Sequence, residues 1–233
     1  MSTRLALRRM KGSLYFTRAS GANVSVPANA DFNTAAGTFE CWAQIGHLTD
    51  GGHYNDLMCL KNGTDTIEFM CHSTATDSGK IGVSAGVGVV AFGYTATPLS
   101  WAWGWHHLVL TWGAAGVYIY IDGGNMLTVS AANKSLTWGG NPSLYFGAYS
   151  GSSYELLGNM CGIRIYNRAI LATEVLQRYQ GVVISTGLVS SWNMDDMTGT
   201  TVTDTVSGHN GTISSLSNIY WSPSSPTKER VSR

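Results

Sequence analysis

A pair of adjacent segments near the middle of the chain constrains the fold more than any other feature. Residues 105–112 and 117–123 both have the two-residue period of a pleated strand, and a short Gly/Ala link joins them. This arrangement is typical of an antiparallel hairpin. Leu108 and Leu110 share one face of the first strand, so we expect that face to point into a core. Asp122 and Gly123 tolerate a positive φ and are expected to end the second strand.

The same period recurs along the chain at intervals of roughly ten residues. We expect further strands at residues 13–17, 23–26, 37–46, 56–60, 66–71, 80–85, 88–92, 125–129, 143–147, 158–166, 188–192, 201–204 and 211–213. The period becomes helical at about residues 172–179, where Gly181 would end one short helix. The sequence therefore predicts an all-β, two-sheet antiparallel sandwich with a single short helix.

Composition bounds the size of the domain and the kinds of partner. The chain has 233 residues, of which 44% are hydrophobic, enough for one large β domain or two small ones. Its formal net charge is zero, so there is no global electrostatic case for nucleic acid as a partner. No apolar run approaches the length of a transmembrane helix, and we expect no membrane span.

The two ends of the chain are polar. Residues 1–12 form a basic arm that carries Arg4, Arg8, Arg9 and Lys11. Its apolar stretch is shorter than a secretory signal needs, so we expect that the chain folds where it is made or that a leader has been lost. The arm is expected to dock on an acidic partner surface or to be a disordered leader, and residues 222–233 are expected to be a polar tail.

The four cysteines have no CxxC spacing, and each lies in an apolar, strand-like context. Such residues are expected to be buried free thiols. A disulfide between Cys59 and Cys71 across a hairpin is the alternative.

Three stretches together resemble the laminin-G-like, concanavalin A-like jelly-roll superfamily. The first combines residues 13–16 (SLYF), 24–27 (VSVP) and 37–42 (GTFECW); the second is the central hairpin; the third is residues 162–170 (GIRIYNRAI), followed by Glu174 and Val175. The resemblance implies a jelly-roll fold and spans about residues 13–181. One departure is Leu171, where the family usually has a Ser helix cap, which favours a helix that starts as late as Thr173.

The C-terminal segment looks like the one that usually begins such a domain. The similar stretches are residues 187–195 (GLVSSWNMD), 199–204 (GTTVTD) and 208–212 (GHNGT). A segment this short cannot close a sandwich alone. We therefore expect a circular permutation in which residues 188–221 add edge strands beside residues 13–17 of the same domain. The alternative is pairing with a neighbouring subunit.

Catalysis is not expected. The superfamily includes glycanases with two or three carboxylates on one strand face, because acid and nucleophile must flank one bond. Here the glutamates are isolated along the chain: Glu40, Glu68, Glu155 and Glu174. Asp195 and Asp196 are adjacent and would point to opposite faces of a strand. There is no Ser nucleophile elbow and no phosphate-binding Gly loop.

Metal binding has two candidate locations. The loop with His47, Asp50, His53 and Asp56 is irregular in spacing and rich in Gly, and a solvated loop is the favoured interpretation. Calcium is the more plausible cofactor, because related sandwiches bind it at loop oxygens. Asp204 is then the first candidate ligand, followed by Asp195 and Asp196. Alternatively, Asp204 caps its own turn through backbone N–H groups.

Several aromatic residues are candidates for binding a ligand. Trp101, Trp103, Tyr118 and Tyr120 alternate along strands and could stack on sugar rings, and His53 and Tyr54 are the remaining ligand-binding candidates. Packing within the sheets is the alternative for the strand aromatics. His106 and His107 point to opposite faces, so packing and cross-strand hydrogen bonds are expected for them instead of catalysis.

We therefore expect a non-catalytic binding or attachment module. Proteins of this type without a secretory signal resemble phage virion components, which implies a structural or decoration protein on a capsid or tail. Such a protein would contact other virion subunits, like subunits in a homo-oligomer, or host glycans. The alternative is a free calcium-dependent carbohydrate-binding lectin at a cell surface or outside the cell, and a glycan hydrolase is less favoured.

Overall fold

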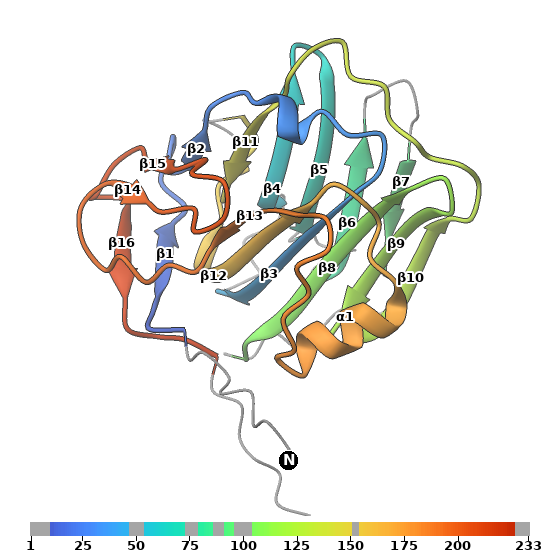
Figure 1. The fold of residues 1–233 in the computed structure, drawn as a ribbon. Coiled ribbons are helices and arrows are strands. Elements are labelled where there is room, and N and C mark those ends of the chain that lie inside the picture. The colour runs from blue at the N-terminus through green and yellow to red at the C-terminus, as the bar shows by residue number, and fades with distance from the viewer. Residues whose placement is uncertain are drawn as a thin grey trace, which may run out of the picture.

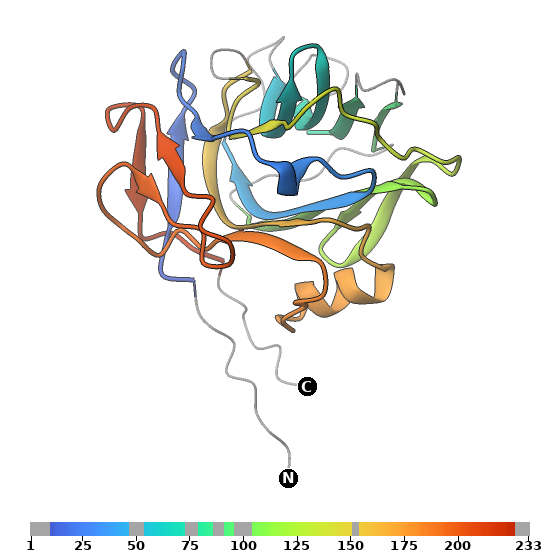
Figure 2. The ribbon, with the colours of Figure 1, turned by 45° about the horizontal axis from the view of Figure 1, so that its top comes forward.

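A computed structural model describes residues 10–46, 54–72, 79–85, 91–95, 104–150 and 154–226. Two antiparallel sheets lie face to face, and one α-helix packs against the outer side of the first sheet (Figures 1 and 2). The predicted two-sheet sandwich with a single short helix is confirmed.

The first sheet has the order β10 (Gly124–Ser130), β9 (Gly116–Ile121), β8 (His106–Gly113), β3 (Gly37–Ile45), β12 (Leu157–Tyr166), β1 (Ser13–Thr17) and β16 (Ile219–Ser222), and β13 (Leu188–Trp192) also pairs with β12. The second sheet has the order β14 (Thr201–Val202), β15 (Gly211–Ile213), β2 (Val24–Val26), β11 (Ser143–Phe146), β4 (Tyr54–Asn62), β5 (Asp65–His72), β6 (Ile81–Ala85) and β7 (Ala91–Tyr94). A 3-10 turn, η1 (Ala30–Phe32), and the helix α1 (Ala172–Tyr179) complete the described elements.

The central hairpin forms as its pattern predicts. β8 and β9 pair in antiparallel register, with Leu108 opposite Ile121 and Leu110 opposite Ile119. These side chains are buried in the main core between the two sheets. Alternation on a pleated strand is sufficient to put them there, because every second side chain points to the same face.

The C-terminal segment completes both sheets of the same chain. β16 pairs with β1 and β15 pairs with β2, so strands from the two ends of the sequence lie side by side at one end of the sandwich (Figure 1). Leu188–Trp192, however, does not lie beside Ser13–Thr17 as expected. β1 and β13 instead follow one another along β12, because β12 is long enough to pair with both. The strand β16 was not expected, since only four residues alternate there between polar flanks.

The four cysteines are buried free thiols, as expected, and Cys59 and Cys71 form no disulfide. Their positions explain this, since Cys59 is opposite Glu68 and Cys71 is opposite Asn55 in the β4–β5 register. In the part of the chain that the structure describes, no helix is long and apolar enough to cross a membrane.

Helix α1 covers a second, smaller core on the outer face of the first sheet. Val175 is fully buried there and belongs to a cluster with Val109, Tyr120, Tyr166 and Ile170. The helix spans Ala172–Tyr179, as expected, without the later start at Thr173 that Leu171 favoured. The carboxylate of Glu174 explains the earlier start, because it accepts a hydrogen bond from the Leu171 N–H at 2.8 Å and so replaces the missing Ser cap.

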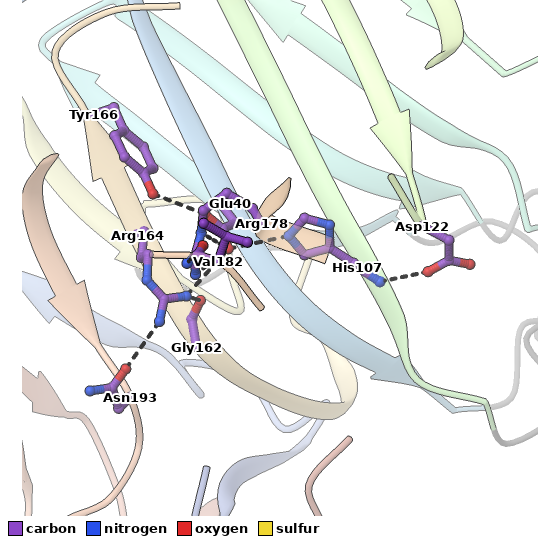
Figure 3. A network of polar contacts seen from close by, with 9 residues as sticks. All are labelled: Glu40, His107, Asp122, Gly162, Arg164, Tyr166, Arg178, Val182 and Asn193. Carbon is purple, nitrogen blue, oxygen red and sulfur yellow. Dashed lines mark hydrogen bonds and ion pairs between the residues drawn. The ribbon is translucent and has the colours of Figure 1, made fainter. Parts of the chain in front are cut away.

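A buried charge network lies beside this smaller core (Figure 3). Glu40 of β3 is fully buried, and it is contacted by Arg178 of α1 at 3.0 Å and by Arg164 of β12 at 3.3 Å. His107 Nε2 lies 3.2 Å from the same carboxylate, and the Tyr166 hydroxyl donates to it at 3.3 Å. Glu40 is isolated only in the sequence. In the fold, two strands and the helix bring partners to it.

These partners keep Glu40 ionised. Burial raises its pKa, but Arg164, Arg178 and His107 together lower it well below its ordinary value. A folded-state pKa below the unfolded value stabilises the fold above pH 4.5, and that contribution is lost as the pH falls further. Removing one member of a buried charge network strongly destabilises the fold, because the remaining members are left unpaired.

We expect Glu40→Gln to lower the free energy of unfolding by about 3–5 kcal/mol at pH 7, because Arg164 and Arg178 lose their counter-charge inside the protein. Urea denaturation measures this. Glu174→Gln is the matched control, since its pair with Arg168 is part-exposed and should contribute only about 1 kcal/mol or less. Equal effects of the two substitutions would contradict the interpretation.

Candidate functional site

The outer face of the second sheet carries two carboxyl groups, those of Asp56 and Glu68, on neighbouring strands. On β5, Ile67 and Phe69 point into the main core, so Glu68 and Met70 point outward. Asp56 of β4 is opposite Met70 in the register and therefore shares this outer face. Tyr54, two residues before Asp56, lies on the same face.

Tyrosine rings gather over this face. Tyr149 and Tyr154 come from the connection between β11 and β12, and Tyr154 meets Tyr54 edge-on with ring centroids 4.8 Å apart. Tyr149 and Tyr154 are 6.0 Å apart. We call the group the tyrosine–carboxylate cluster, and its members are Tyr54, Asp56, Lys61, Glu68, Tyr149 and Tyr154.

The backbone that presents two of these rings is strained. Ser150 and Tyr154 both have positive φ angles, 41° and 60°. A bulky residue rarely adopts this conformation, and such residues concentrate at binding and active sites, where the surrounding structure holds them. Tyr154 is held by its carbonyl oxygen, which accepts a hydrogen bond from the Asp56 N–H at 2.9 Å. Its ring is 40% exposed and so available to a ligand.

Lys61 already places one cation on the cluster. Its ammonium lies 4.5 Å from the centroid of the Tyr149 ring and donates to the Ser150 hydroxyl at 3.2 Å. Burial raises the pKa of Glu68, and Lys61 opposes that shift, so the two side chains are electrostatic partners. Tyr149 therefore has a face suited to positive charge.

Asp56 has no cationic partner among the described residues. It is fully buried, and neither carboxylate oxygen has a hydrogen-bond partner among the described residues. Burial raises its pKa well above the ordinary value, and the nearby Glu68 and Glu155 raise it further. A buried polar group normally has a partner, so an orphaned carboxyl in a native fold requires an explanation. The arrangement can accept a ligand group that donates hydrogen bonds or carries positive charge.

Of the predicted ligand-binding residues that the structure describes, Tyr54 alone lies in this cluster. Tyr118 and Tyr120 lie on β9 of the other sheet, where Tyr120 is buried and the Tyr118 hydroxyl donates to the Ala115 carbonyl at 2.6 Å. Trp101, Trp103 and His53 lie outside the described residues, as do Arg4, Arg8 and Arg9. Lys11 is exposed, and its backbone N–H donates to Asp195 at 2.9 Å.

The predicted calcium ligands hold turns together. Asp204 accepts hydrogen bonds from the N–H groups of Ser191, Val206, Ser207 and His209. Asp196 accepts two from Thr203, through the backbone N–H and the hydroxyl. Within the described ranges, no group of three or more His, Cys, Asp or Glu residues is arranged to hold a metal ion. The geometry therefore favours the capping alternative for Asp204, and calcium stays a prediction.

Three polar side chains, Ser190, His209 and Asp31, contact one another in the order of a hydrolase triad. The Ser190 hydroxyl lies 2.9 Å from His209 Nδ1, and His209 Nε2 lies 3.3 Å from Asp31. Ser190 is fully buried in β13, so its hydroxyl cannot reach a substrate. We assign these three side chains a structural role, because their contacts join the C-terminal segment to the turn η1.

Sequence reasoning missed Asp56, Tyr149 and Tyr154 as members of one site. Asp56 was correctly expected at the start of a strand, but the only chemical role considered for it was in a metal site with the preceding loop. Two tyrosines flank a short Gly/Ser segment, residues 150–153, between two strands. That pattern was visible in the sequence and would have indicated a ligand-binding loop.

Comparisons with known proteins agree with the fold. Residues 18–176 match a family described as the concanavalin A-like lectin/glucanases superfamily, in its Laminin_G_3 branch. No curated protein matches the chain.

Solved structures resemble the chain at low sequence identity, which shows the fold alone. A candidate carbohydrate-binding protein from Bacteroides ovatus is 17% identical with a TM-score of 0.67, and the match covers 91% of this chain and 60% of that one. A heptameric SAP-like pentraxin from Limulus polyphemus is 10% identical with a TM-score of 0.62, covering 93% and 97%. The carbohydrate-binding module CBM40 of a Ruminococcus gnavus sialidase, bound to α2,3-sialyllactose, is 9% identical with a TM-score of 0.52, covering 69% and 100%.

The buried carboxyl group of Asp56 should make the stability of the fold depend on pH in an unusual way. As the pH rises from 3.8, Asp56 ionises in the unfolded state but keeps its proton in the fold, so it destabilises the fold increasingly until the folded-state pKa is reached. Asp56→Asn removes this effect. We expect the gain in stability of the variant over wild type to be larger at pH 7 than at pH 4. Urea denaturation at the two pH values measures this, and an equal gain at both would contradict the assignment.

Proposed function

Because the chain belongs to the concanavalin A-like lectin/glucanases superfamily, we propose that it is a non-catalytic binding module that recognises a glycan through the tyrosine–carboxylate cluster. Aromatic rings stack on the apolar faces of sugars, and nearby polar groups bind the hydroxyls. Carbohydrate-binding proteins among the structural relatives support this class of ligand.

The observation that carries the proposal is the contact between Tyr54 and Tyr154 on the outer face of the second sheet. Their rings lie 4.8 Å apart, and Tyr154 is held in a strained backbone conformation while 40% of it stays exposed. Core packing does not require a strained, exposed aromatic residue. Pre-organisation of a ring for a ligand does, because it lowers the entropy that binding costs.

The setting of the module is a separate proposal. We propose that it acts on a virion surface, the setting that the resemblance to phage virion components led us to expect. Mass spectrometry of purified particles from an infected host tests this: the chain should be present at a fixed ratio to the capsid or tail subunits. Its absence from particles would favour the free lectin.

We expect Tyr154→Ala to weaken glycan binding by about tenfold or more, because each aromatic anchor contributes about 1–3 kcal/mol to a sugar or ring contact. A glycan array identifies the ligand, and calorimetry on the purified variants measures its affinity. Tyr220→Ala is the matched control, since Tyr220 is 46% exposed and stacks on Tyr15 at 5.0 Å in the other sheet. If both variants bind like wild type, the site is elsewhere; if no glycan binds wild type, the proposed function is wrong.

A further inference from the structure

The charges of the tyrosine–carboxylate cluster do not balance. Glu68 has Lys61 as its electrostatic partner. Burial lowers the pKa of Arg18 and Glu155 opposes that shift, so Glu155 interacts with that cation. Asp56 is left over. No cation among the described residues lowers its pKa, and the charges that act on it are carboxylates.

The fold shows elsewhere what a buried carboxylate needs. Glu40 is as deeply buried as Asp56, and two guanidinium groups, an imidazole and a hydroxyl lie within 3.3 Å of it. Asp56 has neither a cation nor a hydrogen-bond donor in the described chain. Burying a carboxyl without a partner is costly, and a ligand that supplies the partner removes that cost on binding.

The walls around Asp56 suit a cation as well. Tyr154, whose ring meets that of Tyr54 edge-on, interacts electrostatically with Asp56, and Tyr149 already accepts the Lys61 ammonium on its face. Rings and carboxylates together are the surroundings in which proteins bind ammonium groups. A neutral saccharide would use the rings but would leave Asp56 without a charged partner.

We infer that the ligand of this cluster is a saccharide with a free amino group, which binds as an ammonium ion against Asp56. The inference rests on the proposed function and specifies its substrate class. Access requires a side-chain rotation, because Asp56 is covered, and Tyr154 is the exposed member of the ring pair. Rotations of exposed side chains are fast compared with binding.

Burial and the neighbouring Glu68 and Glu155 raise the pKa of Asp56, which favours its protonated form. A carboxyl group that stays protonated can transfer its proton to an incoming neutral amine. The O–H bond of Asp56 breaks, an N–H bond forms on the amine, and the products are a carboxylate and an ammonium ion. No proton is exchanged with solvent, and both members of the new pair are charged and hydrogen-bonded.

The test compares three β-1,4-linked tetrasaccharides, of glucosamine, N-acetylglucosamine and glucose, by calorimetry on the full chain. Wild type should bind the glucosamine tetramer at least about tenfold more tightly than the other two, as expected for a charge-assisted hydrogen bond. Asp56→Asn should bind all three with similar affinity. Glu174→Gln, which alters a carboxylate on the helix side of the first sheet, should keep the preference.

The outcomes separate the inference from the proposed function. Equal binding of the three sugars by wild type, or a preference that survives in folded Asp56→Asn, would overturn the inference, while a loss of binding in Tyr154→Ala would still support the glycan site. If wild type binds no saccharide, the proposed function and the inference both fail. A thermal melt monitored by circular dichroism confirms that Asp56→Asn is folded.

Discussion

The ionised carboxylate of Glu40, buried under the helix, is the interaction that the outer side of the first sheet depends on. Its partners come from β8, β12 and α1, so the charge is satisfied only when these elements are in their final places. Apolar side chains tolerate small changes of position, whereas a buried ion pair does not. The network therefore fixes where the helix sits on the sheet.

The second sheet presents the opposite case. Asp56 is equally buried, but the described chain provides it with no partner. Proteins keep such unfavourable groups mainly where function requires them, since stability alone would favour their replacement. The outer face of the first sheet is thus covered by the helix, whose Arg178 pairs with Glu40. The outer face of the second sheet carries the Asp56 carboxyl group, which has no hydrogen-bond partner among the described residues. This asymmetry is why we place recognition on the second sheet.

Much of the fold could be predicted from local patterns, and most of the site could not. Alternation in β3, β8, β9 and β12 identified strands correctly, because one face of each strand supplies apolar side chains to the main core between the sheets. The partners of Glu40 come from positions more than 60 residues away in the sequence, and no local period reports such a contact. The surroundings of Asp56 were missed for the same reason: its N–H donates to the carbonyl of Tyr154, which lies about 100 residues further along the chain and is brought close only by the fold.

The pairing of β1 with β16 also sets the order in which the chain can mature. The Thr17 hydroxyl donates to the Asn218 carbonyl across a separation of 201 residues. During translation, the neighbour of the first strand on one side emerges about 200 residues later than the strand itself. Until then that edge has open N–H and C=O groups, which can pair with other chains. Long-range contacts of this kind slow folding, so the nascent protein has an extended period in which association competes with closure.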